Sequence, residues 1–493
     1  MKVVQQSATK VVVGFPGSAT PLRTVLRGTV WNGLSVAAAR FVPGILTILL
    51  AWWIEPSDLG VISFVLAYYG IFSLVADWSV AYAVQKLIPE NPEHMAEVAW
   101  TALFVRLGFS AVLGLACWGL DDSTGIFHGY GDYLALLLVA SAFGIIVSVH
   151  NARCEFAAGS LFSVGFQLAW LGLAVVLVKE GMPVRGPLLA LALSFAAVGI
   201  PGFVLNRELR RRVEFLWPVA RQILHFGLWA TLATVLNGFA GQVGILVVAY
   251  INGDAAAGVF KVATTFGVLP ALLGMIVVMP LMPVAKRELL NGGDVSESLV
   301  RPIVRCLLMV GLPLVTAGFV LAPAVISTFV SASYLGAVWP MRILLGASLL
   351  RTLVTAVSGV LFVGQGLKEL ARIEGAVAAV TLIGGILLSR TEGLIGMAVA
   401  LLAAWFVGAV LLYRWFERRA PLGLEWRSYL RYAGSAVLMA TLVFFGIRLV
   451  PSPVERFLLG GVLATVIYAS LLWMQQDLPF QSLVRGVRQR AVG

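Results

Sequence analysis

The stretch Ile45–Ala67 reads ILTILLAWWIEPSDLGVISFVLA, two apolar runs joined by a short acidic turn. A second stretch, Gly244–Gly267, reads GILVVAYINGDAAAGVFKVATTFG and has the same layout. An offset of 198 residues aligns the two and places Gly258 on Gly60. The recurrence predicts two similar halves in the same membrane orientation, as in transporters built from parallel repeats. The alternative is that apolar hairpins resemble one another by composition alone.

The composition indicates a membrane protein. Of the 493 residues, 60% are hydrophobic and 12% are charged, with a mean hydropathy of +0.94. Soluble domains are about one quarter charged, and a helix needs about 20 apolar residues to span a bilayer. Apolar runs of that length recur along the chain. We therefore predict an all-α membrane protein of about 14 transmembrane helices, with two six-helix lobes in a parallel repeat plus two C-terminal helices.

The basic residues predict the orientation. Of the 35 Lys and Arg residues, 25 fall on the side of the two termini, five on the other side and five within the predicted spans. Because Lys and Arg gather in cytoplasmic loops, both termini are expected in the cytoplasm. The predicted divisions are a cytoplasmic N-terminal segment 1–28, a first six-helix lobe 29–206, a cytoplasmic linker 207–222, a second six-helix lobe 223–416, a cytoplasmic loop 417–429, two additional transmembrane helices 430–475 and a cytoplasmic tail 476–493.

Five basic residues lie within the predicted spans, namely Arg40, Arg106, Lys261, Arg342 and Arg351. Arg342 is close to an outer helix end, where its side chain can reach the interface. The other four lie roughly 10–20 Å from the nearest helix end at 1.5 Å per residue. A charge at the bilayer centre costs about 2.5–3.5 kcal/mol on insertion scales. We predict that these four share a wet, positively charged cavity; the alternative for each is a buried structural link between helices.

Acidic residues at this depth are scarce. Asp77 is the main one, and it is the predicted residue for ion coupling; alternatively, it pairs with a nearby base. Glu155 and Glu374 fall at inner helix ends and are expected to be solvated. Four cations against one carboxylate favour an anionic ligand, and Arg and Lys both bind phosphate. A polyprenyl-pyrophosphate headgroup meets this requirement.

Several classes of site have no support in the sequence. The three cysteines and four histidines show no metal-ligand spacing, so neither a metal site nor a cofactor is predicted. No nucleotide-binding motif occurs, so transport would draw on an ion gradient or on the gradient of the substrate. The predicted outer loops are short and offer no room for catalytic groups, so we predict a protein that is not an enzyme.

Three segments resemble bacterial oligosaccharide flippases, the polysaccharide-transporter branch of the MOP superfamily. LRGTVWNGLSVAAARFVPGILTILLAWW and the residues after it, Leu26–Lys86, resemble the first two helices. HFGLWATLATVLNGFAGQVGILVVAYING and its continuation, His225–Leu289, resemble the seventh and eighth. GLPLVTAGFVLAPAVISTF and its continuation, Gly311–Leu345, resemble the ninth and the start of the tenth. The likeness covers about the first 415 residues.

This resemblance implies two six-helix lobes around a V-shaped cavity. It implies that a polyprenyl-pyrophosphate-linked oligosaccharide moves from the inner to the outer leaflet of a bacterial cytoplasmic membrane by alternating access, for surface polysaccharide export. The partners implied are lipid-linked oligosaccharide, membrane lipids, a polysaccharide polymerase and export machinery, with no nucleic acid. The residues implied to hold the pyrophosphate are Arg40, Arg106, Lys261 and Arg351.

Other functions stay open at this stage. A lipid II-type flippase also has fourteen helices. A drug/cation antiporter of the same superfamily would carry carboxylates in its cavity, whereas this chain carries mostly bases. A membrane-embedded polysaccharide enzyme would need a large outer loop with catalytic side chains. A scaffold that transports nothing would tolerate loss of the four intramembrane cations.

Overall fold

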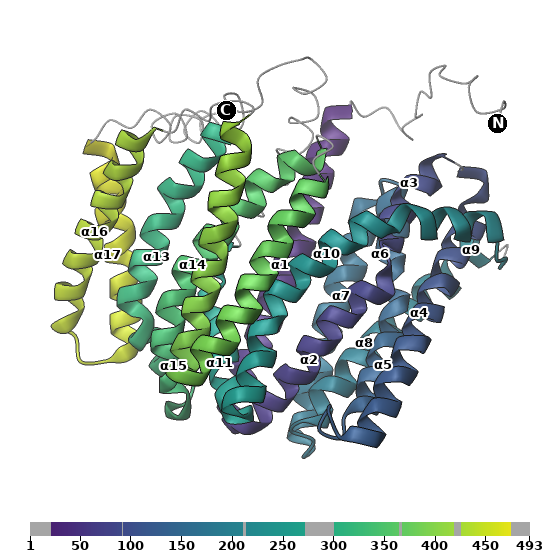
Figure 1. The fold of residues 1–493 in the computed structure, drawn as a ribbon, viewed down its shortest axis with the longest axis horizontal. Coiled ribbons are helices and arrows are strands. Elements are labelled where there is room, and N and C mark those ends of the chain that lie inside the picture. The colour runs from purple at the N-terminus through teal and green to yellow at the C-terminus, as the bar shows by residue number, and fades with distance from the viewer. Residues whose placement is uncertain are drawn as a thin grey trace.

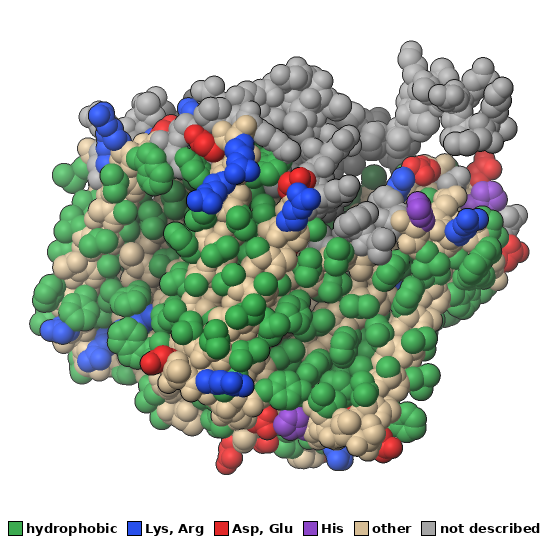
Figure 2. Space-filling model, viewed as in Figure 1, with side chains coloured by type: hydrophobic (Ala, Val, Ile, Leu, Met, Phe, Trp, Pro, Cys, Tyr) green, Lys and Arg blue, Asp and Glu red, His purple; other side chains and the backbone are tan. Residues whose placement is uncertain are grey.

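The computed structural model describes residues 21–90, 92–210, 213–271, 300–363, 367–418 and 425–474. Within these residues the chain forms helices joined by short turns, as predicted, and twelve helical stretches are long and apolar enough to cross a membrane. Figure 2 shows hydrophobic side chains across the middle of one face, with charged side chains toward its two rims. The predicted tail and most of the predicted N-terminal segment lie outside the described residues.

The first lobe, lobe 1, contains the helices from α1 to α8. We call the end of the bundle where α1, α4 and α7 begin the upper end, and the end where α2, α5 and α8 begin the lower end (Figure 1). The bounds are α1 Pro21–Trp53, α2 Pro56–Asp77, α3 Val80–Glu90, η1 Pro92–His94, α4 Met95–Thr124, α5 Gly131–Ser141, η2 Ala142–Ile145, α6 Ile146–Ala152, α7 Phe156–Lys179 and α8 Arg185–Leu205.

Two predicted spans of lobe 1 are interrupted. One break falls within the apolar stretch 59–84, between α2 and α3, where Trp78 and Ser79 both adopt left-handed backbone angles, with φ of 42° and 54°. Non-glycine residues rarely hold this conformation, so the surroundings must stabilise it. The Trp78 indole donates to the carbonyl of Leu224 at 3.1 Å, and the Ser79 hydroxyl lies 2.8 Å from that of Thr231. The span expected over 133–149 is divided by η2.

Lobe 2 contains the helices from α11 to α15, and α10 connects the lobes. The bounds are α9 Arg207–Arg210, α10 Trp217–Asn252, α11 Asp254–Gly267, α13 Arg301–Phe329, η4 Ala332–Ala337, α14 Val338–Val363 and α15 Leu367–Glu417. The upper half of α10 contacts α3 and α4, whereas the helix also packs along α15 (Figure 1). The 36 residues of α10 therefore tie lobe 1 to lobe 2.

α15 is one continuous assignment that folds back on itself. Its backbone leaves the helical region at Gly393, with φ 56° and ψ −130°, and its two arms pack side by side, with Gly385 against Met397. Glycine suits this reversal because it has no Cβ to clash at positive φ. The predicted count of fourteen helices stays a prediction, because only 14 residues of α11 are described and α15 counts once among the twelve stretches.

The two last helices, α16 Trp426–Arg448 and α17 Pro453–Met474, pack against α13 (Figure 1). The Tyr468 hydroxyl donates to the carbonyl of Met309 at 2.7 Å. At the upper end, the Arg305 guanidinium donates to the Glu425 carboxylate at 3.0 Å and to the Tyr432 hydroxyl at 2.9 Å. These bonds join the C-terminal pair of helices to lobe 2.

The lobes meet at the lower end, where the two sequence-similar hairpins cross. A Cβ added to Gly60 would lie 1.8 Å from the carbonyl oxygen of Asp254, and one added to Gly258 would lie 1.9 Å from that of Pro56. Adding 198 to 56 gives 254, and adding 198 to 60 gives 258, so the two contacts are equivalent within the repeat. We call this crossing of α2 and α11 the glycine seam. The backbones come this close only because both crossing positions lack a side chain.

Candidate functional site

A cavity of about 660 Å³ lies between α1 of lobe 1 and the helices α11, α13, α14, α16 and α17. Its walls are almost wholly apolar and include Ile45, Phe266, Leu314 and Met439. Arg40 is the charged residue on these walls, and its side chain is exposed to the cavity. Long apolar walls with one cation suit an amphiphile with an anionic head and a hydrocarbon tail.

Arg351 of α14 lies close enough to Arg40 for the two cations to interact electrostatically. Its guanidinium carbon stands 5.3 Å from the centre of the Trp405 ring, a cation–π distance. Its two terminal nitrogens lie 3.7 Å from where a Cβ of Gly241 would be, so α10 leaves room for the guanidinium. The sequence predicted both arginines as pyrophosphate ligands, and the structure places them in one another's field.

Glu374 faces the Arg351 guanidinium, contrary to the expectation that Glu374 is solvated. Its side chain is 4% exposed, hydrogen-bonded to the Asn237 side chain and within electrostatic reach of Arg351. Its Oε2 has no hydrogen-bond partner among the described residues. The expectation failed because the first arm of α15 packs along α10, and depth along one helix does not reveal its neighbours. The polar Asn237 in an apolar run was the available signal.

Arg106 and Asp77 pair within lobe 1. Arg106 Nη1 lies 3.1 Å from Asp77 Oδ1, and the two side chains are 14% and 19% exposed. This matches the alternative interpretation of Asp77 as the partner of a nearby base. The structure thus brings Arg106 to Asp77 and Arg40 to Arg351, and these contacts do not join all four predicted cations in one cluster.

Lys261 lies on the face of α11 that meets lobe 1. It is one turn beyond Gly258 of the glycine seam and one turn before Thr265, whose methyl group lies 3.6 Å from where a Cβ of Gly44 on α1 would be. The described part of the chain holds no hydrogen-bond or ion-pair partner for its side chain, which is half-buried. Its counterpart Ser63 is buried and donates to the carbonyl of Leu59 at 2.6 Å.

Arg342, which the sequence places near an outer helix end, stacks between two aromatic rings. Its guanidinium carbon lies 4.8 Å from the Phe319 ring centre and 4.6 Å from that of Trp339. In the described ranges, no three His, Cys, Asp or Glu side chains are grouped to hold a metal ion.

The profile of a family described as polysaccharide biosynthesis protein matches residues 49–339, more than half of the chain. The chain belongs to this family. The matched region contains the glycine seam and two of the four predicted cations, Arg106 and Lys261, whereas Arg40 and Arg351 lie outside its two ends. A comparison with curated proteins finds no match.

The chain is similar in fold to several solved transporter structures. The structure of "Lipid II flippase MurJ, inward closed conformation" is similar over 93% of this chain and 100% of that chain, with a TM-score of 0.73 and 14% identity. An inward-facing multidrug resistance MATE family transporter of the MOP superfamily matches over 83% and 96%, with a TM-score of 0.63 and 16% identity. A MOP superfamily transporter from Pyrococcus furiosus matches over 81% and 96%, with a TM-score of 0.59 and 15% identity. At these identities the likeness establishes the fold.

Proposed function

We propose that this chain is a flippase that moves a polyprenyl-pyrophosphate-linked oligosaccharide from the inner to the outer leaflet of a bacterial cytoplasmic membrane, for surface polysaccharide export. The observation that carries the proposal is the apolar cavity with Arg40 on its wall. A polyprenyl chain needs apolar walls, and a pyrophosphate needs cations, and this cavity offers both side by side.

The charges around the cavity support an anionic head. Arg40 and Arg351 interact with one another, and Glu374 is the carboxylate that faces Arg351. Two cations against one carboxylate leave a net positive field, to which Lys261 of α11 adds a cation without a described partner. A drug/cation antiporter would instead present an excess of carboxylates, so the anion carrier is favoured.

The Arg106–Asp77 pair supports a way to couple transport to an ion. A pyrophosphate that reaches Arg106 competes with Asp77 for the same guanidinium, because both are oxygen anions. The carboxylate that is released is then free to take up a proton or another cation. We propose that Asp77 couples ion movement to substrate movement through this exchange.

The state of the lobes suits a substrate taken from the inner leaflet. The glycine seam joins the lower ends of the lobes. Two hydrogen bonds add to it: the Trp52 indole donates to the carbonyl of Phe329 at 2.5 Å, and the Tyr334 hydroxyl donates to the carbonyl of Ile54 at 3.3 Å. The positive-inside rule assigns the lower end to the outer side. We infer that the protein is closed outward here and that alternating access separates this seam.

The decisive experiment follows lipid-linked oligosaccharide across the bilayer of proteoliposomes. The wild type is expected to move it, and the double variant Arg40→Ala with Lys261→Ala is expected to lose that movement. Arg448→Gln is a matched control, because Arg448 lies at the lower end of α16 and stacks on Phe444 rather than lining the cavity. Lack of movement by the folded wild type, across several sugars with a pyrophosphate link, would refute the proposal and direct attention to the antiporter.

A further inference from the structure

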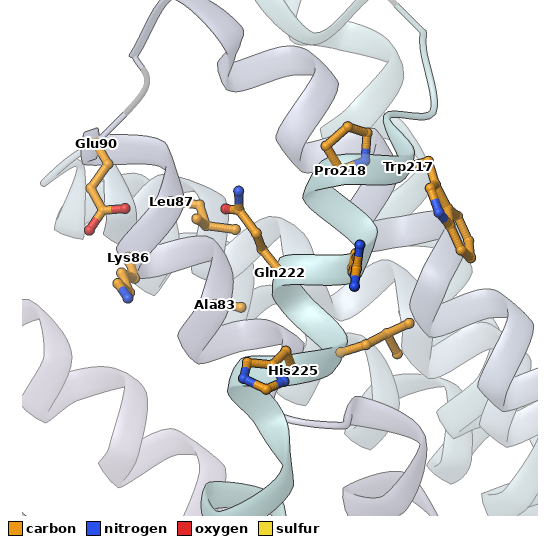
Figure 3. A pocket seen from close by; sticks show the side chains of 10 residues that line it. Ala83, Lys86, Leu87, Glu90, Trp217, Pro218, Gln222 and His225 are labelled. Carbon is orange, nitrogen blue, oxygen red and sulfur yellow. The ribbon is translucent and has the colours of Figure 1, made fainter. Parts of the chain in front are cut away.

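A second, polar pocket of about 980 Å³ lies at the upper end of lobe 1, between α3 and the first turns of α10. Figure 3 shows the lining residues on the two helices, with Lys86 and Glu90 on α3 and Gln222 and His225 on α10. Arg221 and Trp217 of α10 complete the polar and aromatic lining. None of these residues belongs to the apolar cavity or to the predicted cation set.

The helical spacing places several lining side chains of each helix on one face of that helix. Trp217, Arg221 and His225 follow one another at intervals of four residues, so they lie on one face of α10. Lys86 and Glu90 have the same spacing on α3. Ala83 also lines the pocket on α3.

The chemistry of the lining is that of a phosphorylated sugar site. Lys86 and Arg221 are the basic residues of the lining, and Arg presents the planar fork that matches phosphate oxygens. Glu90 and Gln222 supply acceptors and donors for hydroxyl groups. The exposed Trp217 offers an apolar face and an N–H group, a combination that binds ligands with one apolar and one polar side.

The pocket lies above the Arg106–Asp77 pair. Lys86 lies seven positions after Ser79, which itself follows Asp77 by two positions, and seven positions span about 10 Å along a helix at 1.5 Å per residue. Lys86 is therefore about two helical turns along α3 from the chain break that follows Asp77.

We propose that the pocket between α3 and α10 is a loading site for the glycosyl phosphate part of the substrate, used before the headgroup enters the membrane. This inference rests on the proposed function for its role but not for its binding chemistry. Lys86 and Arg221 hold the phosphate, while Trp217, Glu90 and Gln222 contact the first sugar. An exposed Trp at this level is also typical of a membrane-interface belt, so the test treats Trp217 separately.

The test measures protection of a single cysteine. In a variant in which Cys117, Cys154 and Cys306 are replaced by Ser, Pro218→Cys places a thiol on the pocket wall, and a water-soluble maleimide reports its accessibility. Glucose 1-phosphate, inorganic pyrophosphate and glucose are the probes, with sulfate at equal ionic strength as the reference. Glucose 1-phosphate and pyrophosphate are expected to slow labelling, and glucose and sulfate are expected to have no effect.

Variants assign the protection to the pocket. Lys86→Gln with Arg221→Gln is expected to weaken protection by both phosphates about tenfold or more, the effect of losing charge-assisted hydrogen bonds. Trp217→Ala is expected to weaken protection by glucose 1-phosphate but not by pyrophosphate. Arg210→Gln is the matched control, since this exposed cation of α9 lies at the upper end but does not line the pocket. Elution as a single peak in size exclusion and an unchanged unfolding midpoint establish that each variant is folded.

Two results would overturn the inference. One is equal labelling with and without both phosphates in the folded parent; the other is protection that survives Lys86→Gln with Arg221→Gln. Flipping assays separate this failure from that of the proposed function. If the pocket loads substrate, the double variant needs about tenfold more lipid-linked oligosaccharide for half-maximal flipping, with the maximal rate retained. If the wild type flips nothing but its pocket is still protected, the flippase proposal fails while the binding site stands.

Discussion

Pro56–Gly60 of lobe 1 and Asp254–Gly258 of lobe 2 occupy equivalent positions in the repeat, and each glycine lies against the carbonyl that opens the other helix. Three residues after the glycine the likeness ends, because Ser63 is buried and bonded to its own helix, whereas Lys261 is a half-buried cation. The two lobes share the backbone contact of the glycine seam, and lobe 2 alone carries a cation at the position three residues after the glycine.

The buried arginines of the two lobes also differ in the groups that they contact. Lobe 1 neutralises Arg106 by direct contact with Asp77, at 3.1 Å. In lobe 2, Arg351 stacks on Trp405, and the carboxylate of Glu374 is also hydrogen-bonded to Asn237. Arg351 therefore interacts with several groups at once, and its positive charge also interacts with that of Arg40. The two arginines should respond differently when each is removed.

The largest expected effect comes from Arg351→Ala. It leaves Glu374, 4% exposed, without its cation, and breaking a buried pair in this way costs about 3–5 kcal/mol of unfolding free energy. Arg106→Ala should cost about 1–3 kcal/mol, because the partly exposed Asp77 keeps access to water. SDS-induced unfolding in mixed micelles measures both, and Glu374→Gln should restore most of the stability lost in Arg351→Ala. Equal losses in the two lobes would contradict the distinction.

The glycine seam should respond equally from both sides. Gly60→Ala and Gly258→Ala each force a Cβ against a carbonyl, and overpacking of this kind costs about 1–3 kcal/mol. Gly119→Ala on α4 is the matched control, because a Cβ there meets no atom within 4 Å, and a helical Gly→Ala exchange is then neutral or stabilising. Unfolding midpoints give the comparison, and a seam variant as stable as the control would show that the lobes do not depend on this contact.

Replacing Lys261 by the serine of lobe 1 should alter transport rather than folding. Lys261→Ser copies the lobe 1 residue and removes a cation without a described partner, so stability should be kept while flipping slows about tenfold, the effect of one charge-assisted contact. Ser63→Lys, the reverse exchange, puts a charge at a position 2% exposed and should destabilise the protein. Flipping that is unchanged in folded Lys261→Ser would remove Lys261 from the proposed anion site.

The smallest expected effect concerns Tyr68 of α2 and Tyr250 of α10, whose hydroxyl oxygens lie 2.8 Å apart. Tyr68→Phe or Tyr250→Phe removes one hydrogen bond and should weaken closure of the lower end by about 1 kcal/mol. A double-mutant cycle tests this, with maleimide labelling of a Ser63→Cys reporter as the measure of closure. The double variant should lose no more than either single one if the two hydroxyls act as a pair.

Local pattern explains which parts of the fold the sequence could predict. Apolar runs of membrane length predict helices because the bilayer requires every backbone polar group to be bonded within its own segment. The hairpins around residues 55 and 253 follow from this, since each interrupts an apolar run with an acidic turn. The breaks at Trp78 and within α5–α6 did not follow, because they are stabilised by partners distant in sequence, such as Leu224.

The amino-acid sequence by itself determined that the chain is a helical membrane protein, that its two halves repeat and that isolated cations lie within its spans, because hydropathy and charge are properties of each residue. The tertiary structure alone decided which groups those cations meet: Asp77 for Arg106, Arg40 and Glu374 for Arg351, and no described partner for Lys261. It also decided that α3 and α10 enclose a polar pocket. Electrostatic energy depends on distances between side chains far apart in the chain, and only helix packing sets those distances.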